Sequence, residues 1–93
     1  MHIVRIAYDA PGRDAERKTY FEAHRAHLRS GLARILQSGP LFATDGFGAK
    51  AGALVVFDVE DIAEVERFNA QDPYIVNGVY DRVNILRWDK TIG

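Results

Sequence analysis

A chain of 93 residues, 47% of them hydrophobic and 27% charged, is long enough to fold as one domain over residues 1–93 and too apolar to stay disordered. A formal net charge of −1 without any basic block argues against nucleic acid as a partner. The absence of cysteine excludes disulfides, thiol catalysis and thiolate metal sites. No apolar stretch has the length of a membrane span, so we expect a soluble cytoplasmic protein with no membrane partner.

The local patterns predict four strands and two helices. A Pro11-Gly12 turn separates the first strand, which is β-branched and alternating, from a long helix that Asp14 can cap. Ser38-Gly39-Pro40 is expected to end that helix, because proline cannot continue it. A glycine-rich segment at 45–52 is typical of a hairpin-like connection. The predicted strands are 2–8, 41–44, 53–59 and 83–88, and the predicted helices are 14–37 and 61–71.

Two signals delimit the second helix. Asp61 and Glu64 have the spacing of a capping box, in which each side chain accepts a backbone N–H bond at the helix start. Asp72-Pro73 ends the helix, because a residue before proline avoids the α conformation. The carboxylate of Asp72 either accepts local backbone N–H bonds in a simple turn or stands fixed beside a cleft.

The element order βαββαβ predicts an α+β protein with a ferredoxin-like, four-stranded antiparallel sheet and two helices on one face. The other face needs a cover too. The segment 54–57 is apolar at consecutive positions, and the last strand carries Leu86 and Trp88 on one side and Val83 and Ile85 on the other. A second copy is the simplest cover, which predicts a homodimer whose two sheets form a barrel-like assembly. The alternative is a monomer with a partly apolar open face.

The first predicted helix places a histidine at the centre of its apolar stripe. At about 100° per residue, Tyr20, Leu28 and Gly31 lie within about 40° of His24, whereas Arg25 falls on the opposite side. His24 is therefore either a core histidine or a functional group facing a cleft. The mid-helix Gly31 gives either space for a ligand beside the imidazole or close packing of helix on sheet.

Arg17 lies on the same stripe, two turns before His24. Its charge either extends past the helix end into solvent or serves an anionic ligand. The i, i+3 spacing of His24 and His27 suits a metal ion, but the sequence offers no obvious third ligand. We therefore expect no bound metal.

The C-terminal part of the chain resembles a known family. The run Asp72-Pro73-Tyr74-Ile75-Val76-Asn77-Gly78-Val79-Tyr80, which continues to Val83 and Trp88, is similar to the C-terminal signature of YCII-related proteins. The N-terminal half agrees with that resemblance. The matching residues there are Gly39-Pro40-Leu41 after the first helix, His24 with Leu28 four residues later, and Arg17 seven residues before the histidine.

This resemblance implies a ferredoxin-like fold, a dimeric α+β barrel and a His–Asp pair as active site, which maps onto His24 and Asp72. The chain departs from the family at Phe21, where many members carry a second arginine, so a ligand that needs two arginines is not implied. One characterised branch of the family removes chloride from a chlorinated hydroxyquinol. Nothing in this sequence places the chain in that branch.

We expect a small cofactor-independent enzyme in which Asp72 fixes the tautomer of His24 and His24 transfers a proton. A small phenolic, enolic or carbonyl substrate suits such a base, in lyase, isomerase or dehydrochlorinase-like chemistry. Two other functions stay open, namely a non-catalytic ligand-binding dimer and a cofactor-free monooxygenase of the dimeric α+β barrel type. The residues expected to contact the small-molecule ligand are Arg17, Tyr8, Pro40 and Tyr74.

Overall fold

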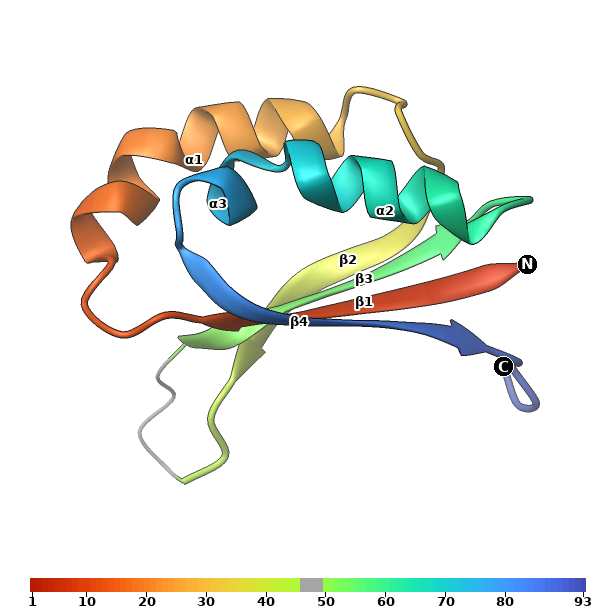
Figure 1. Ribbon diagram of the computed structural model, residues 1–93. Coiled ribbons are helices and arrows are strands. Elements are labelled where there is room, and N and C mark those ends of the chain that lie inside the picture. Colours follow the sequence, from red (N-terminus) through yellow and green to blue (C-terminus); the bar gives the residue numbers. More distant parts are fainter. Residues whose placement is uncertain (46–49) are drawn as a thin grey trace.

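The computed structural model describes residues 1–45 and 50–93, which form a four-stranded sheet with helices on one face (Figure 1). The strands run antiparallel to their neighbours in the order β2-β3-β1-β4. This is the predicted α+β, ferredoxin-like arrangement. The strands are β1 (His2–Asp9), β2 (Ile35–Phe42), β3 (Lys50–Asp58) and β4 (Tyr80–Trp88), and the helices are α1 (Asp14–Leu28), α2 (Ile62–Gln71) and α3 (Pro73–Val76).

The capping box predicted for the second helix is confirmed at the start of α2. The Asp61 carboxylate accepts a hydrogen bond from the Ala63 N–H at 2.9 Å, and the Glu64 carboxylate accepts one from the Asp61 N–H at 3.2 Å. At the other end, Asp72 has extended backbone angles, φ −64° and ψ 121°, as expected before Pro73. Asp72 then caps the short helix α3, which the sequence did not predict.

The prediction that the first helix continues to about residue 37 is wrong, because α1 ends at Leu28. The Ser30 hydroxyl donates to the His27 carbonyl at 2.7 Å, which satisfies one of the free carbonyls at the helix end. Gly31 follows with φ +79°, a left-handed conformation that glycine adopts at little cost. Gly31 therefore turns the chain after the helix, and neither mid-helix role predicted for it applies.

Residues predicted to end the first helix instead belong to a strand. Ser38, Gly39 and Pro40 lie inside β2, which runs from Ile35 to Phe42 rather than over 41–44. Because β2 is an edge strand, a proline without an N–H is tolerated there. The next strand, β3, pairs with β2 in an antiparallel register, and residues 46–49, including Gly46 and Gly48 of the predicted connection, lie outside the described residues.

The core fills the space between the sheet and α2. Ile3, Val55 and Phe57 from the sheet contact Val65 and Phe68 of α2, and all five side chains are at most 2% exposed. Burial of this apolar surface is the main stabilising contribution of the fold. A second cluster joins β1 and β4 to α3 and comprises Ala7, Tyr74, Val79 and Tyr80.

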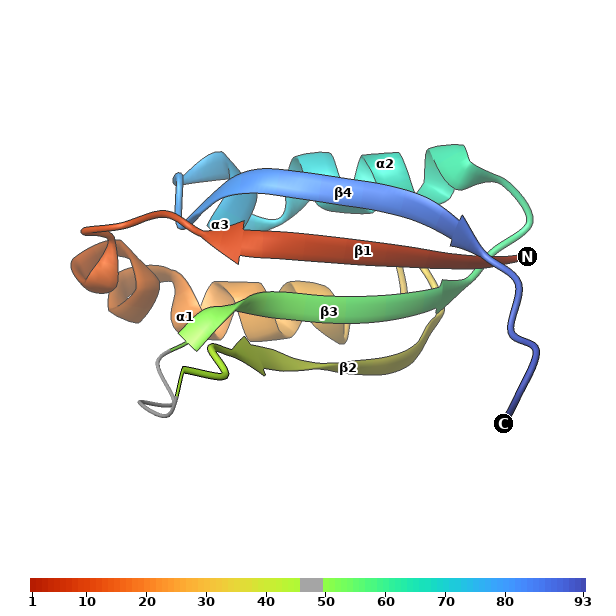
Figure 2. The same ribbon diagram turned by 90° about the horizontal axis from the view of Figure 1, so that it is seen from below.

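The opposite face of the sheet carries no helix, as the view from below shows (Figure 2). Strand alternation directs Val4 and Leu54 to this open face, because their neighbours Ile3 and Val55 belong to the helix-side core. Leu86 and Trp88, in register with Val4 and His2, are 55% and 39% exposed there. Within the described residues, no helix has the length and apolar character needed to cross a membrane.

Candidate functional site

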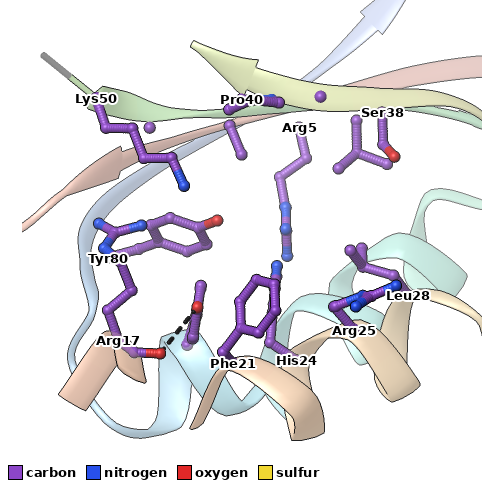
Figure 3. A pocket seen from close by; sticks show the side chains of 15 residues that line it. Arg5, Arg17, Phe21, His24, Arg25, Leu28, Ser38, Pro40, Lys50 and Tyr80 are labelled. Atoms are coloured by element: carbon purple, nitrogen blue, oxygen red, sulfur yellow. Dashed lines mark hydrogen bonds between the residues drawn. The ribbon is translucent and has the colours of Figure 1, made fainter. Parts of the chain in front are cut away.

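A pocket of about 370 Å³ lies between α1 and the sheet (Figure 3). Its volume falls within the range of about 300–1,000 Å³ that is usual for small-molecule sites. The side chains of Arg5 from the sheet and His24 from α1 approach each other in it. The lining residues are Arg5, Arg17, Phe21, His24, Arg25, Leu28, Ser38, Gly39, Pro40, Lys50, Gly52, Ala53, Val55, Tyr74 and Tyr80.

His24 is buried, with 7% exposure, and its ring is held in one orientation. The ring stacks on Tyr74 with centroids 3.9 Å apart and planes only 4° apart, while Tyr80 approaches it edge-on at 6.1 Å. His24 Nδ1 lies 2.7 Å from Oδ1 of Asp72. An ionised carboxylate only accepts, so Nδ1 carries the hydrogen and the neutral ring has its lone pair on Nε2.

Asp72 is the centre of the polar cluster and is fully buried. Its Oδ1 also accepts the Tyr74 N–H at 2.9 Å, and its Oδ2 accepts from Arg5 Nη1 at 2.9 Å. Burial raises the pKa of Asp72, but the hydrogen bond and charge of His24, the charge of Arg5 and the Tyr74 N–H together lower that pKa below its ordinary value. Asp72 is therefore ionised at neutral pH and orients two basic side chains at once.

Arg5 is a residue of the candidate site that sequence reasoning missed. It is completely buried on β1, between Ile3 and Ala7 of the helix-side face. Its guanidinium lies 5.3 Å from the Phe68 ring centroid and 5.8 Å from that of Tyr80. The available signal was a charge within an alternating strand, but both faces of β1 carry apolar residues, so the alternation did not tell which face Arg5 occupies.

The two tyrosines beside His24 stay protonated at neutral pH. Burial raises the pKa of Tyr80, and the Arg5 charge compensates this only in part. Burial also raises the pKa of Tyr74, whose hydroxyl donates to the Arg17 carbonyl at 3.1 Å. The Tyr80 hydroxyl lies inside the pocket (Figure 3), so it can serve there as a hydrogen-bond donor.

The pocket lining carries further cationic side chains besides Arg5. These are Arg17 and Arg25 of α1 and Lys50 of β3, with Arg17 paired to Asp9 at 2.7 Å. Arg25 was predicted on the outer side of the helix. The structure corrects that prediction, because the long Arg25 side chain, with its guanidinium carbon 5.5 Å from the Phe21 ring centroid, is part of the pocket lining.

The remaining sequence candidates are divided between the pocket and other surroundings. Arg17, Pro40 and Tyr74 line the pocket as expected for ligand contacts. Tyr8 does not, because strand alternation turns it to the open face, where its ring lies 4.0 Å from the Arg82 guanidinium carbon. His27 bonds the Phe68 carbonyl at 2.7 Å through Nε2 and so belongs to the contact between α1 and α2.

No group of three or more potential metal ligands occurs among residues 1–45 and 50–93. Nothing in this part of the chain thus assembles around His24 and His27 as a metal site. The chemistry that the described side chains do offer is acid/base: an imidazole oriented by a carboxylate, beside a buried guanidinium and a protonated phenol.

Fold and site together define the class, an α+β protein of the ferredoxin-like type with a pocket between its first helix and the sheet. Within that class, the chain belongs to the family of the YCII-related domain, whose model matches residues 1–89. A curated relative is an uncharacterised protein of Haemophilus influenzae, 32% identical over 99 residues, with 97% of this chain and 98% of the relative covered.

Solved structures share the fold. One is 5-chloro-2-hydroxyhydroquinone dehydrochlorinase (TftG) from Burkholderia phenoliruptrix in complex with 2,5-dihydroxybenzoquinone, with a TM-score of 0.85, 26% identity and coverage of 98% of this chain and 96% of that one. Another is Rv0793 from Mycobacterium tuberculosis, with a TM-score of 0.57, 9% identity and coverage of 99% and 97%. The second likeness concerns the fold alone.

Proposed function

We propose that this protein is a cofactor-independent acid/base enzyme acting on a small phenolic, enolic or carbonyl compound. One observation carries the proposal. His24 Nδ1 is bonded to the buried Asp72 carboxylate, while Nε2 has no hydrogen-bond partner among the described residues and its ring lines the pocket. This arrangement leaves Nε2 free to take a proton from a substrate and to return one.

The proton transfer follows from these contacts. When Nε2 accepts a proton, the imidazolium stays bonded to the Asp72 carboxylate at 2.7 Å, which stabilises its charge. The electron pair left on the substrate passes to a phenolate or enolate oxygen. Arg5 and the protonated Tyr80 line the same pocket and are suited to stabilise that oxygen.

The dehydrochlorinase among the structural neighbours supports this substrate class, since it is named for a chlorinated hydroxyhydroquinone and its structure holds 2,5-dihydroxybenzoquinone. Its reaction removes chloride from the substrate, and proton transfer is a usual part of such eliminations. We propose dehydrochlorinase-like, lyase or isomerase chemistry for the present chain. The proposed assembly is a homodimer that buries the open sheet faces, and its proposed location is the cytoplasm.

The test is catalysed hydrogen exchange in deuterium oxide, followed by proton NMR, with three enolisable probes: 2,5-dihydroxybenzoquinone, phenylpyruvate and neutral phenylacetone. We expect the wild type to accelerate exchange on at least one probe. The His24→Gln variant should lose about a hundredfold or more of that rate, the usual range for a general acid/base.

His27→Gln is the matched control, because His27 sits one turn away on the same helix but bonds Phe68 rather than Asp72. It should retain exchange. Equal rates for wild type and His24→Gln would overturn the proposal. Binding of the probes without any exchange would favour the non-catalytic ligand-binding dimer, and oxygen consumption with the same probes would favour a cofactor-free monooxygenase.

A further inference from the structure

One edge of the buried Arg5 guanidinium has no partner among the described residues. Nη1 donates to Asp72 at 2.9 Å and lies 3.4 Å from Oδ1 of Asn69. Nε and Nη2, by contrast, are buried and make no hydrogen bond with any described residue. Buried polar groups are nearly always hydrogen-bonded, and an unsatisfied donor is costly, the more so when it is charged.

The two free nitrogens form a defined recognition surface. Nε and Nη2 share one side of the planar guanidinium, so their N–H bonds point nearly parallel, the geometry that binds two oxygen atoms at once. Arg5 lines the pocket, and Figure 3 shows its side chain extending from the sheet toward His24. The Asp72 carboxylate pairs with Arg5 through Nη1 and leaves this edge unpaired.

The charges of the pocket point to an anion. Arg5, Arg17, Arg25 and Lys50 line it, and its described lining contains no aspartate or glutamate. The charge of Arg17 is compensated by Asp9 at 2.7 Å. Arg25 pairs more loosely, with 4.0 Å between its Nη1 and Oε1 of Glu22, and Lys50 has no ion pair with a described residue. The field inside the pocket therefore favours negative charge.

The aromatic side chains add a shape requirement. Phe21 and Tyr80 flank the space beside Arg5 and His24 in Figure 3, and both line the pocket. Flat rings around this space suit a planar ligand, whose faces can stack on them.

We infer that the pocket binds a small planar anion with two oxygen atoms in one plane, held by Nε and Nη2 of Arg5. A carboxylate and a neighbouring enolate–carbonyl pair share this chemistry. The inference rests on the proposed function in that such an anion, or its conjugate acid, is the substrate of His24. Arg5 and His24 are bonded to the two oxygens of the same carboxylate and line the same pocket, so an anion held by Arg5 shares this pocket with the imidazole.

The experiment is calorimetric titration of the wild type at low ionic strength with benzoate, its neutral isostere benzamide, and 2,5-dihydroxybenzoquinone. Benzoate offers a carboxylate, and the quinone offers a neighbouring enolate–carbonyl pair. Comparing their affinities therefore shows which of these two groups the pocket binds. We expect at least one of the two oxygen-pair probes to bind about tenfold or more tightly than benzamide, because charge-assisted bidentate bonds are about twice as strong as neutral ones.

The informative variant is Arg5→Lys, which keeps the positive charge beside Asp72 but removes the paired N–H bonds. It should lose the preference for the oxygen-pair probe over benzamide. The matched control is Arg87→Lys, a substitution of the same type at an arginine of β4 that does not line the pocket. It should bind all probes as the wild type does.

A second measurement applies if Arg5→Lys fails to fold. In the wild type, the NMR resonance of the Arg5 Nε–H should shift on addition of the tighter oxygen-pair probe and stay in place with benzamide. The inference is overturned if none of the probes binds at millimolar concentration, if benzamide binds as tightly as both oxygen-pair probes, or if folded Arg5→Lys keeps the preference.

Failure of the inference is distinguishable from failure of the proposed function. His24→Gln should keep the preference for the oxygen-pair probe and lose hydrogen exchange, because anion binding depends on Arg5 and proton transfer on His24. Exchange on neutral phenylacetone without any anion preference would leave the acid/base function standing and overturn the anion site alone.

Discussion

At the scale of single residues, the structure gives Asp72 two tasks where the sequence predicted one. Its carboxylate orients the His24 ring through a hydrogen bond, and it is the partner of the fully buried Arg5. The distance between His24 and Asp72 agrees with the expected proximity, and the catalytic role of the pair remains a prediction. The second task means that Asp72→Asn perturbs stability as well as activity, so His24→Gln is the cleaner test of catalysis.

We expect Asp72→Asn to lower the free energy of unfolding at neutral pH by about 3 kcal/mol, because removal of one partner leaves the buried Arg5 charge uncompensated. Denaturant unfolding of wild type and variant measures this difference. His27→Gln, which removes a hydrogen bond to a backbone carbonyl without exposing a charge, is the control and should cost less. A loss below about 1 kcal/mol in Asp72→Asn would contradict the buried-pair account.

The same carboxylate predicts a pH dependence. The pKa of Asp72 is lower in the folded protein than its ordinary value of 3.8, so the unfolded state binds the proton more readily. Its contribution to stability is therefore complete above about pH 4 and is lost as the pH falls through the lowered pKa. Unfolding curves recorded from pH 5 downward should show a steeper loss for the wild type than for Asp72→Asn. Parallel curves would contradict this assignment.

At the scale of elements, the pocket depends on how β3 approaches β1. Gly52 stands opposite Tyr8 on β1, and a Cβ at this position would come within 1.9 Å of the Ala7 carbonyl oxygen. A backbone atom cannot move aside as a flexible side chain can. Only glycine allows this spacing of the two strands, which also places the Gly52 backbone in the pocket lining.

We therefore expect Gly52→Ala to destabilise the protein by about 1–3 kcal/mol, the usual cost of overpacking. Gly39→Ala is the matched control, since Gly39 also lies in a strand of the pocket wall but a methyl group there would meet no heavy atom within 4 Å. Chemical denaturation of both variants makes the comparison. Similar stabilities for the two would show that the strands can separate without cost.

At the scale of the whole molecule, one layer of helices covers one face of the sheet and leaves the other apolar. Leu54 lies on this open face, together with the exposed Leu86 and Trp88. An exposed apolar patch of this kind is typical of an interface. The predicted homodimer would bury it by packing the two sheets face to face.

We expect the wild type to sediment as a dimer, with twice the 10.4 kDa mass of the chain. Leu54→Lys should yield monomer or aggregate, because a lysine charge at a sheet interface costs several kcal/mol unless it is paired. Ala26→Lys on the exposed side of α1 introduces the same side chain away from the sheet and should stay dimeric. A wild type that is monomeric at micromolar concentration would refute the assembly.

The sequence by itself determined the order of the four strands and the two longer helices, the capping box at Asp61 and the inward side of α1 at His24. These features depend on contacts between residues a few positions apart, which local patterns record. The end of α1 was missed because Gly31 was assigned to the apolar stripe, although Ser30-Gly31 forms the turn that ends the helix. The strand predicted at 41–44 is shorter than β2 because, from sequence alone, Pro40 argues against a longer strand. A proline is tolerated only in an edge strand, and which strand lies at the edge depends on how the whole sheet assembles.

Only the tertiary structure decided what surrounds His24. Asp72 lies 48 residues away in the chain, and Arg5 lies 67 residues from Asp72, so no local spacing joins them. Whether Arg5 or Tyr8 enters the pocket depends on which face of β1 the helices cover, and both faces carry apolar residues. The packing of α2 on Ile3 and Phe57 selected that face and with it placed Arg5 on the side of the pocket, because alternation along a strand fixes every side chain once one is buried.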